Sequence, residues 1–431
     1  MSNKPKTKND TAWEKIFDKY NIENEINKHG FYEITSEHIN EFREARLMTK
    51  FDHKNSLPQL FEENSLSILP ITRGSYVIAP FEAYHVIEKP THQVQKLSFP
   101  DYIQSINYEN ITSEATAINT AYVAGIFADF TGDEELLPTV SGRMGSDVFD
   151  FAIKNSINGS MKQITVTNSQ IEIDGGYEGL NSLTLIEAKN SISDDFLIRQ
   201  LYYPFRLWQS KLHKPVKPIF LMYSNGIFRL NEYVFEDPAN YNSLKLVKQR
   251  NYSIEPEDIT FDDILDIYKR VNMVDEPDGI PFPQANSFSR VINLCELLYE
   301  NDTLTRDEIT NNYDFDTRQT NYYTDACRYL GLIDKRREDG TVRYYLTDKG
   351  RSLFSSNIRS RNLKFVQWIL EHKAFYLTFK QSLQMYGIPL KDEIIEIMKV
   401  SNLYKVGSYS TFFRRASTIS GWINWILDLS R

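Results

Sequence analysis

The stretch IEIDGGYEGLNSLTLIEAKN, Ile171 to Asn190, is the most informative part of the central sequence. It holds two apolar runs, of which the first ends at Asp174 and the second ends with Glu187 and Lys189. Strand interiors exclude charge because an unpaired buried ion costs several kcal/mol or more. These three ionisable groups therefore need partners, which can be one another or a metal ion.

The two runs are typical of adjacent strands joined by a turn over residues 175–183, where the Gly-Gly pair permits positive φ. Side chains alternate along a strand, so Glu187 and Lys189 share one face, and pairing across the turn brings Asp174 beside Glu187. Two neighbouring carboxylates repel unless a divalent cation lies between them, and such oxygen ligands suit Mg²⁺. A nearby lysine can orient or activate an attacking water. The stretch therefore predicts a Mg²⁺ site.

The 431-residue chain exceeds the usual size of a single domain, so two or three domains are expected. Its 41% hydrophobic and 25% charged residues are typical of a globular protein. Cys295 and Cys327 cannot form a disulfide framework, and the first residues lack the apolar core of a signal peptide. No apolar run approaches the length of a membrane span. We therefore expect a cytoplasmic protein with no membrane partner.

Composition and patterning divide the chain into four predicted domains of an α/β multidomain protein. Residues 1–110 are expected to form an N-terminal α+β domain that could also contact DNA. Strands interleaved with helices indicate a sheet of mixed direction in residues 111–275. An acidic, proline-bearing linker, DEPDGIPFPQAN, leads to a third domain at 287–355, and residues 356–431 form a helical end.

The sequence of the third domain predicts helices followed by a hairpin, which is the order of a winged helix-turn-helix domain. Thr317 can cap its recognition helix, whose first turns hold residues suited to base edges in the major groove. These candidate DNA-binding residues are Arg318, Gln319, Asn321 and Tyr322. Asp339-Gly340 supplies the tight turn of the wing, whose basic residues suit phosphates. The wing candidates are Arg336, Arg337 and Arg343. The alternative is a winged helix that contacts protein.

The C-terminal part is basic beside an acidic remainder. From Ser287 onward the chain carries 21 Lys and Arg against 17 Asp and Glu, although its net charge is −9. In the last predicted helix, Arg414 and Arg415 are further candidates for phosphate contacts. Trp422 and Trp425, which are three residues apart, are expected in the core and not on a base-stacking surface.

The pattern of Asp174, twelve intervening residues and Glu187-Ala188-Lys189 resembles the PD-(D/E)xK nuclease superfamily, with Ile173 in place of the Pro. Helices expected at Glu114–Phe130 and Asp194–Leu212 flank the two strands, as in the core of that superfamily. The resemblance implies a restriction-endonuclease-like, mixed-sheet core in which Asp174 and Glu187 bind Mg²⁺. It also implies that Lys189 assists the nucleophilic water.

The superfamily resemblance implies accessory residues too. A further carboxylate often comes from the preceding helix, and Asp147 and Asp150 are the candidates here. Gln200, in the helix after the motif, is placed like the accessory glutamine of some members.

The core and the winged helix together resemble a bacterial type II restriction endonuclease. This resemblance implies Mg²⁺-dependent hydrolysis of double-stranded DNA at a short specific sequence, leaving 5′-phosphates, in a bacterial cytoplasm. It also implies a companion DNA methyltransferase that protects the host. Because one active site cuts one strand, a duplex break suggests a homodimer.

Other readings of the sequence remain open. A winged helix also reads methylated bases, so a modification-dependent endonuclease that cuts only methylated DNA is one alternative. A second is a non-catalytic DNA-binding regulator with a nuclease-like core, and a third is a surface hairpin with a Glu–Lys pair. The histidines lack zinc-site spacing, and no phosphate-binding glycine loop is present.

Overall fold

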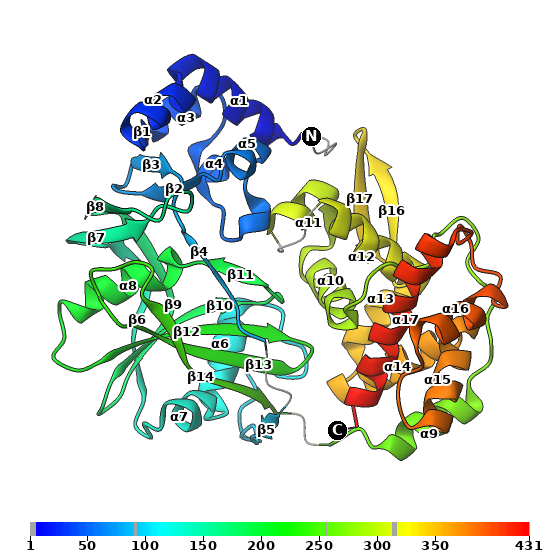
Figure 1. The fold of residues 1–431 in the computed structure, drawn as a ribbon. Helices are drawn as coiled ribbons and strands as arrows, with labels where there is room; N and C mark the ends of the chain where they lie inside the picture. Colours follow the sequence, from blue (N-terminus) through cyan, green and yellow to red (C-terminus); the bar gives the residue numbers. More distant parts are fainter. Residues whose placement is uncertain (1–5, 90–92, 255–256, 313–316, 431) are drawn as a thin grey trace.

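The computed structural model describes residues 6–89, 93–254, 257–312 and 317–430 (Figure 1). Figure 1 shows an N-terminal part above a twisted central sheet, and a largely helical C-terminal part beside the sheet. The N-terminal and C-terminal parts each have a hydrophobic core, and the central part has two. This architecture confirms the predicted mixed α/β class. None of the described helices is long and apolar enough to cross a membrane.

The N-terminal part packs short helices on a three-stranded antiparallel sheet. Its core centres on Trp13, Phe17 and Phe61, whose rings meet edge to face. The elements are α1 (Lys8–Tyr20), α2 (Ile22–His29), β1 (Tyr32–Thr35), α3 (Ser36–Asn40), α4 (Ala45–Thr49), η1 (Lys54–Ser56), α5 (Gln59–Glu63), β2 (Ser67–Pro70) and β3 (Ser75–Ala79).

The central part is built on a seven-stranded sheet of mixed direction. Its order is β5 (Val94–Lys96), β14 (Leu244–Ser253), β13 (Ile227–Phe235), β12 (Val216–Ser224), β10 (Leu183–Lys189), β9 (Gln170–Glu178) and β6 (Leu137–Gly145). The pairs β10–β12 and β14–β5 are parallel, and the other neighbours are antiparallel. A parallel pair needs a crossover, and a helix supplies it between β10 and β12.

Helices cover both faces of this sheet. One core lies under α6 (Glu114–Val123) and α7 (Ile126–Thr131), and the other lies under α8 (Arg199–Gln209). The helix expected over Asp194–Leu212 is shorter than predicted, because its first residues form a strand instead. The remaining strands are β4 (Tyr84–Val86), paired with β11 (Asp195–Leu197), and β7 (Val148–Lys154), paired with β8 (Met161–Thr167).

The prediction of a turn over residues 175–183 is wrong in its extent, because β9 continues through Gly175-Gly176 to Glu178. The turn is therefore confined to residues 179–182, and neither of the two glycines has a positive φ. A Cβ atom at Gly176 would lie 2.7 Å from the Val140 Cβ of β6. Close approach of two strands, and not a turn, accounts for glycine at this position.

The C-terminal part has one continuous core that runs from Ile259 to Ile426. The predicted domains 287–355 and 356–431 therefore share a core, and α9, which lies inside the predicted domain 111–275, packs with them. The elements are α9 (Phe261–Arg270), α10 (Phe288–Asn301), β15 (Thr303–Thr305), α11 (Arg306–Asn312), α12 (Thr317–Tyr329), β16 (Ile333–Glu338), β17 (Thr341–Leu346), α13 (Asp348–Arg351), η2 (Ser352–Ser355), α14 (Ile358–Leu370), α15 (Lys373–Met385), α16 (Lys391–Lys399) and α17 (Tyr409–Asp428).

Two local predictions for the C-terminal part are confirmed. Asp339 and Gly340 join β16 to β17 with φ of +47° and +77°, as a tight turn of this type requires. Trp422 is fully buried and Trp425 packs partly buried against the same core, so both tryptophans stabilise the fold.

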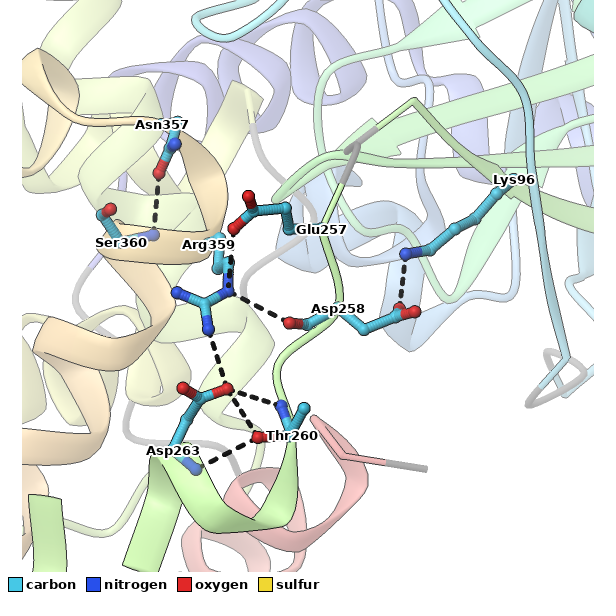
Figure 2. A network of polar contacts seen from close by, with 8 residues as sticks. All are labelled: Lys96, Glu257, Asp258, Thr260, Asp263, Asn357, Arg359 and Ser360. Carbon is cyan, nitrogen blue, oxygen red and sulfur yellow. Dashed lines mark hydrogen bonds and ion pairs between the residues drawn. The ribbon is translucent and has the colours of Figure 1, made fainter. Parts of the chain in front are cut away.

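Polar contacts tie the connection between β14 and α9 to both neighbouring parts (Figure 2). Arg359 of α14 reaches the Asp263 carboxylate at 2.7 Å and the main-chain oxygen of Asp258 at 3.0 Å. The Asp258 carboxylate pairs in turn with Lys96 of β5. The central sheet and the C-terminal part are thereby joined through one short segment.

Candidate active site

Asp174 lies at a β-bulge and not at the end of a strand. β6 pairs with β9 at Gly142 opposite Ile173 and next at Val140 opposite Gly176. Two residue steps of β6 therefore face three steps of β9, so one extra residue is inserted in β9 at this point. A bulge bends its strand and re-aims a side chain, and bulges are frequent beside active sites.

The bulge turns the Asp174 side chain toward β10. Ile173 packs in the core under α8, whereas a Cβ atom at Gly175 would point at Ile118 of α6, so the two residues face opposite sides. Between them, Asp174 Oδ2 accepts a hydrogen bond from the main-chain N–H of Ala188 at 2.9 Å. The carboxylate is therefore held beside the end of β10.

Glu187 and Lys189 lie on the face of β10 that α8 covers. Glu187 Oε1 accepts hydrogen bonds from Lys189 Nζ at 2.7 Å and from Gln200 Nε2 at 2.6 Å. Glu187 is only 9% exposed, and the Lys189 side chain is 13% exposed. The structure thus brings together Asp174, Glu187, Lys189 and Gln200, the last from the first turn of α8.

Burial sets the electrostatics of this cluster. It is the main cause that raises the pKa of Glu187 to about 8, a shift that the charge of Lys189 opposes and that of Asp174 supports. Burial also raises the pKa of Asp174, against the hydrogen bond from Ala188 and the charge of Lys189. Burial alone would lower the pKa of Lys189, but the carboxylates around it, led by Glu187, raise it above its ordinary value. Lys189 therefore stays a cation.

Glu114 and Asp52 join the cluster from distant parts of the sequence. Glu114 begins α6, which packs against β9 and β10, and burial raises its pKa while Lys189 lowers it and Asp174 raises it. Burial would raise the pKa of Asp52 as well, but Lys189, Lys50 and other cations lower it overall. The main-chain oxygen of Asp52 accepts the N–H of Leu197 in β11 at 2.8 Å, which docks the N-terminal part here.

Neither Glu114 nor Asp52 is among the site residues predicted from the sequence. The signal for Glu114 was its position directly after Ser113, which caps α6 by accepting the N–H of Thr116. A carboxylate is favoured in the first turn of a helix by the helix dipole alone, so that signal is not specific. Asp52 carries no local signal, because only the packing of the N-terminal part brings it to β11.

Asp147 and Asp150 do not come from the helix before the motif, and this prediction is wrong. Asp147 lies between β6 and β7 with φ of +56° and pairs with Lys211 at 3.0 Å. Asp150 lies in β7, where it accepts a hydrogen bond from Thr165 Oγ1 at 2.6 Å. The helix that does precede the motif carries Glu114, whose charge interacts with those of Lys189 and Asp174.

The donor set at the cluster fits a hard cation. Asp174 Oδ1 and Glu187 Oε2 accept no hydrogen bond from the described residues, so each carboxylate keeps an oxygen for a ligand. A small hollow lies beside Glu187 and Gln200. Within the described ranges, no group of three or more His, Cys, Asp or Glu side chains is placed to hold a metal ion. Two carboxylates would therefore have to hold Mg²⁺ with waters as its other ligands, and Mg²⁺ commonly keeps several of its waters.

The candidate DNA-binding residues of α12 lie outside the C-terminal core. Arg318 and Asn321 are exposed, and Gln319 and Tyr322 are half-buried. The side chain of Thr317, the predicted cap, lies outside the described residues. The structure also brings α17 to this helix, because Arg415 interacts electrostatically with Tyr322 and burial lowers the pKa of its guanidinium. Arg414 is exposed one residue earlier.

The predicted wing residues lie on two paired strands, β16 and β17. Arg336 and Arg337 of β16 are exposed, and Arg336 lies opposite Arg343 of β17. Glu338 neutralises part of this charge, since its carboxylate lies 2.6 Å from Arg336 and 3.4 Å from Arg343. Of the three arginines, only Arg337 is not paired with Glu338.

Three protein families match the chain, and each is described as a domain of unknown function. The matches cover residues 10–78 (DUF6996), 79–253 (DUF6997) and 290–431 (DUF7226). The ends of the first two matches follow the packing, since the N-terminal core ends at Ile78 and the central sheet ends at Ser253. No curated protein and no solved structure matches the chain.

Proposed function

We propose that this protein is a Mg²⁺-dependent endonuclease that cleaves double-stranded DNA at a specific sequence, in the manner of type II restriction enzymes. The observation that carries the proposal is the cluster of Asp174, Glu187, Lys189 and Gln200 on β9, β10 and α8. Such a concentration of buried ionisable groups with shifted pKa values is costly to a fold and is typical of functional sites.

The order of elements supports a PD-(D/E)xK core. The helices α6 and α7 precede the antiparallel strands β6, β9 and β10, and α8 then crosses over to β12, which is parallel to β10. Apart from the short α7, this order of helix, three strands, helix and strand is what the resemblance to that superfamily implies. The hairpin of β7 and β8 is an insertion between the first two strands.

In the proposed reaction Asp174 and Glu187 hold Mg²⁺, and Glu114 supports the same site from α6. When bound, the ion stabilises the charge that develops on the phosphoryl oxygens during hydrolysis. Lys189 remains a cation beside Glu187, so it can orient the attacking water and balance the charge of the scissile phosphate. Gln200 fixes the Glu187 carboxylate by holding Oε1, which leaves Oε2 to face the ligand.

The order of α10, β15, α11, α12, β16 and β17 supports a winged helix as the DNA-binding module. In this proposal the start of α12 enters the major groove and the basic wing follows the backbone. Arg414 and Arg415 of α17 add cations next to α12. A companion methyltransferase, as in other systems of this class, would protect the host DNA.

Digestion of phage DNA in Mg²⁺, followed by sequencing of the ends, tests the proposal. We expect discrete fragments with 5′-phosphates from unmethylated DNA, and no cutting by Lys189→Ala, which should still bind the DNA. Cutting of methylated DNA alone would assign the protein to modification-dependent enzymes instead. Intact DNA under both conditions, or cutting by Lys189→Ala equal to wild type, would defeat the proposed function.

A further inference from the structure

The loop that follows Lys189 is held by a side chain from the C-terminal part. Asn293 of α10 is 2% exposed, and its Nδ2 donates to the main-chain oxygen of Asn190 at 2.9 Å. Its Oδ1 accepts the main-chain N–H of Ile192 at 3.4 Å. One buried amide therefore satisfies both a donor and an acceptor of the residues directly after the predicted catalytic lysine.

A second contact from the same helix holds the far end of this loop. Arg290, which is 6% exposed, pairs with Asp194 at 2.8 Å. Asp194 precedes β11, which leads into α8 and Gln200. Residues 190–194, which connect Lys189 to Gln200, thus rest on two side chains of α10, one turn apart.

Further contacts of α10 are with α12 and with the turn between β12 and β13. Cys327 of α12 lies 3.6 Å from the main-chain oxygen of Val291, and its sulfur lies 4.0 Å from that of Cys295. Glu296 of α10 accepts Ser224 Oγ at 2.8 Å and the N–H of Asn225 at 3.0 Å. The helix is fixed on one side by the proposed DNA-reading helix and on the other by the central sheet.

We propose that Asn293 is a positioning residue for DNA cleavage, which makes the placement of Lys189 depend on the docking of the winged helix. This inference rests on the proposed function. A catalytic group displaced by about 1 Å loses on the order of 10²-fold in rate, so the backbone after Lys189 must be fixed closely. Asn293 holds this backbone from the domain proposed to read DNA. The cleavage site and the recognition helix are therefore connected through α10.

The test compares Asn293→Ala with Asn362→Ala. Asn362 of α14 is a buried amide of the same interface, which accepts Asn225 Nδ2 at 3.0 Å but does not touch the loop after Lys189. Asn293→Ala should lower the single-turnover cleavage rate by about tenfold or more in Mg²⁺. It should leave the Kd for cognate DNA, measured in Ca²⁺, within about twofold. Asn362→Ala should keep a cleavage rate close to that of wild type.

Hydrogen exchange gives a readout that does not depend on cleavage. The amide of Ile192 should exchange faster in Asn293→Ala than in Asn362→Ala, because only the first variant loses its acceptor. If wild type cuts no DNA, the proposed function fails, while the exchange measurement still decides whether Asn293 holds the loop. Should Asn293→Ala not fold, Asp194→Asn at the exposed end of the loop should give a smaller loss of rate. Equal cleavage by the Asn293 and Asn362 variants, or loss of DNA binding in the first, would overturn the proposal.

Discussion

Asp174 Oδ2 lies 2.9 Å from the main-chain nitrogen of Ala188, just past the point where the regular pairing of β9 with β10 ends at Gly175 and Ile186. The carboxylate takes the place of a backbone acceptor, so it satisfies a strand N–H that the bulge leaves without a partner. One oxygen is thereby fixed by the fold and the other is left for a ligand.

Asp174→Asn should separate these two roles. The amide oxygen can still accept the Ala188 N–H, so the melting temperature should stay close to that of wild type. Loss of the negative charge should lower the cleavage rate by about 10²-fold or more, because a ligand of the cation is lost. Glu178→Gln is the matched control, since this carboxylate at the end of the same strand pairs with Lys214 at 2.8 Å and should change cleavage by less than about twofold.

Glu187→Gln should remove a pH dependence from the stability of the metal-free protein. Burial raises the pKa of Glu187 to about 8 in the folded chain, so the stability present below the unfolded pKa is lost as the pH rises toward 8. Glutamine mimics the protonated acid and does not titrate. The unfolding free energy of wild type should therefore fall, relative to the variant, by up to about 1.4 kcal/mol per unit between pH 5 and 8. Urea denaturation across that range measures the difference, and parallel curves for the two proteins would contradict it.

Glu114→Gln tests the carboxylate that comes from α6. If Glu114 supports the cation, the variant should need a higher Mg²⁺ concentration for half-maximal cleavage, by about tenfold. The stability of α6 should change little, because Ser113 still caps the helix. Glu109→Gln, outside the cluster in the segment before α6, is the control and should leave the Mg²⁺ requirement unchanged. An unaltered Mg²⁺ titration for Glu114→Gln would remove that residue from the site.

The position of Glu187 and Lys189 on one face followed from the alternation of side chains along a strand, and the crossover from β10 through α8 to β12 followed from the order of patterns. The direction of the Asp174 side chain could not be predicted in this way. The bulge that sets it depends on the pairing of β9 with β6, about thirty residues earlier in the chain. Glycines that permit close strand contact look the same in a sequence as glycines that form a turn. Glu114 and Asp52 reach Lys189 only through tertiary packing, which no local pattern records.

A duplex break by one active site per chain requires two chains or two successive nicks. We predict a homodimer on DNA, so sedimentation should show twice the chain mass of 50.4 kDa when cognate DNA is bound. Supercoiled plasmid should then become linear without an accumulating nicked form. A monomer both free and on DNA, with concerted cutting of both strands, would contradict this prediction.

Specificity should lie at the start of α12 and general affinity in the wing. Arg318 is exposed in the first turn of α12, where a recognition helix meets base edges. Arg318→Ala should therefore cost about 1–3 kcal/mol of binding to cognate DNA and little on random DNA. Competition binding with cognate and random duplexes in Ca²⁺ measures both losses. If the variant keeps full discrimination, the reader of the sequence lies in the N-terminal part or in the central sheet.

Arg337→Ala should weaken cognate and random DNA about equally, and should lower the slope of log K against log salt by about one, because a phosphate contact is lost. Arg336→Ala should have a smaller effect, since Arg336 already pairs with Glu338 at 2.6 Å and lies over the ring of Tyr345. The two arginines are neighbours on one exposed strand, so each is a matched control for the other. Salt titrations of both variants distinguish a wing that contacts phosphates from a wing that only contacts protein, because the second would leave the salt slope of each variant unchanged. An equal loss for the two would instead show that Glu338 releases Arg336 when DNA binds, since both cations would then reach phosphates.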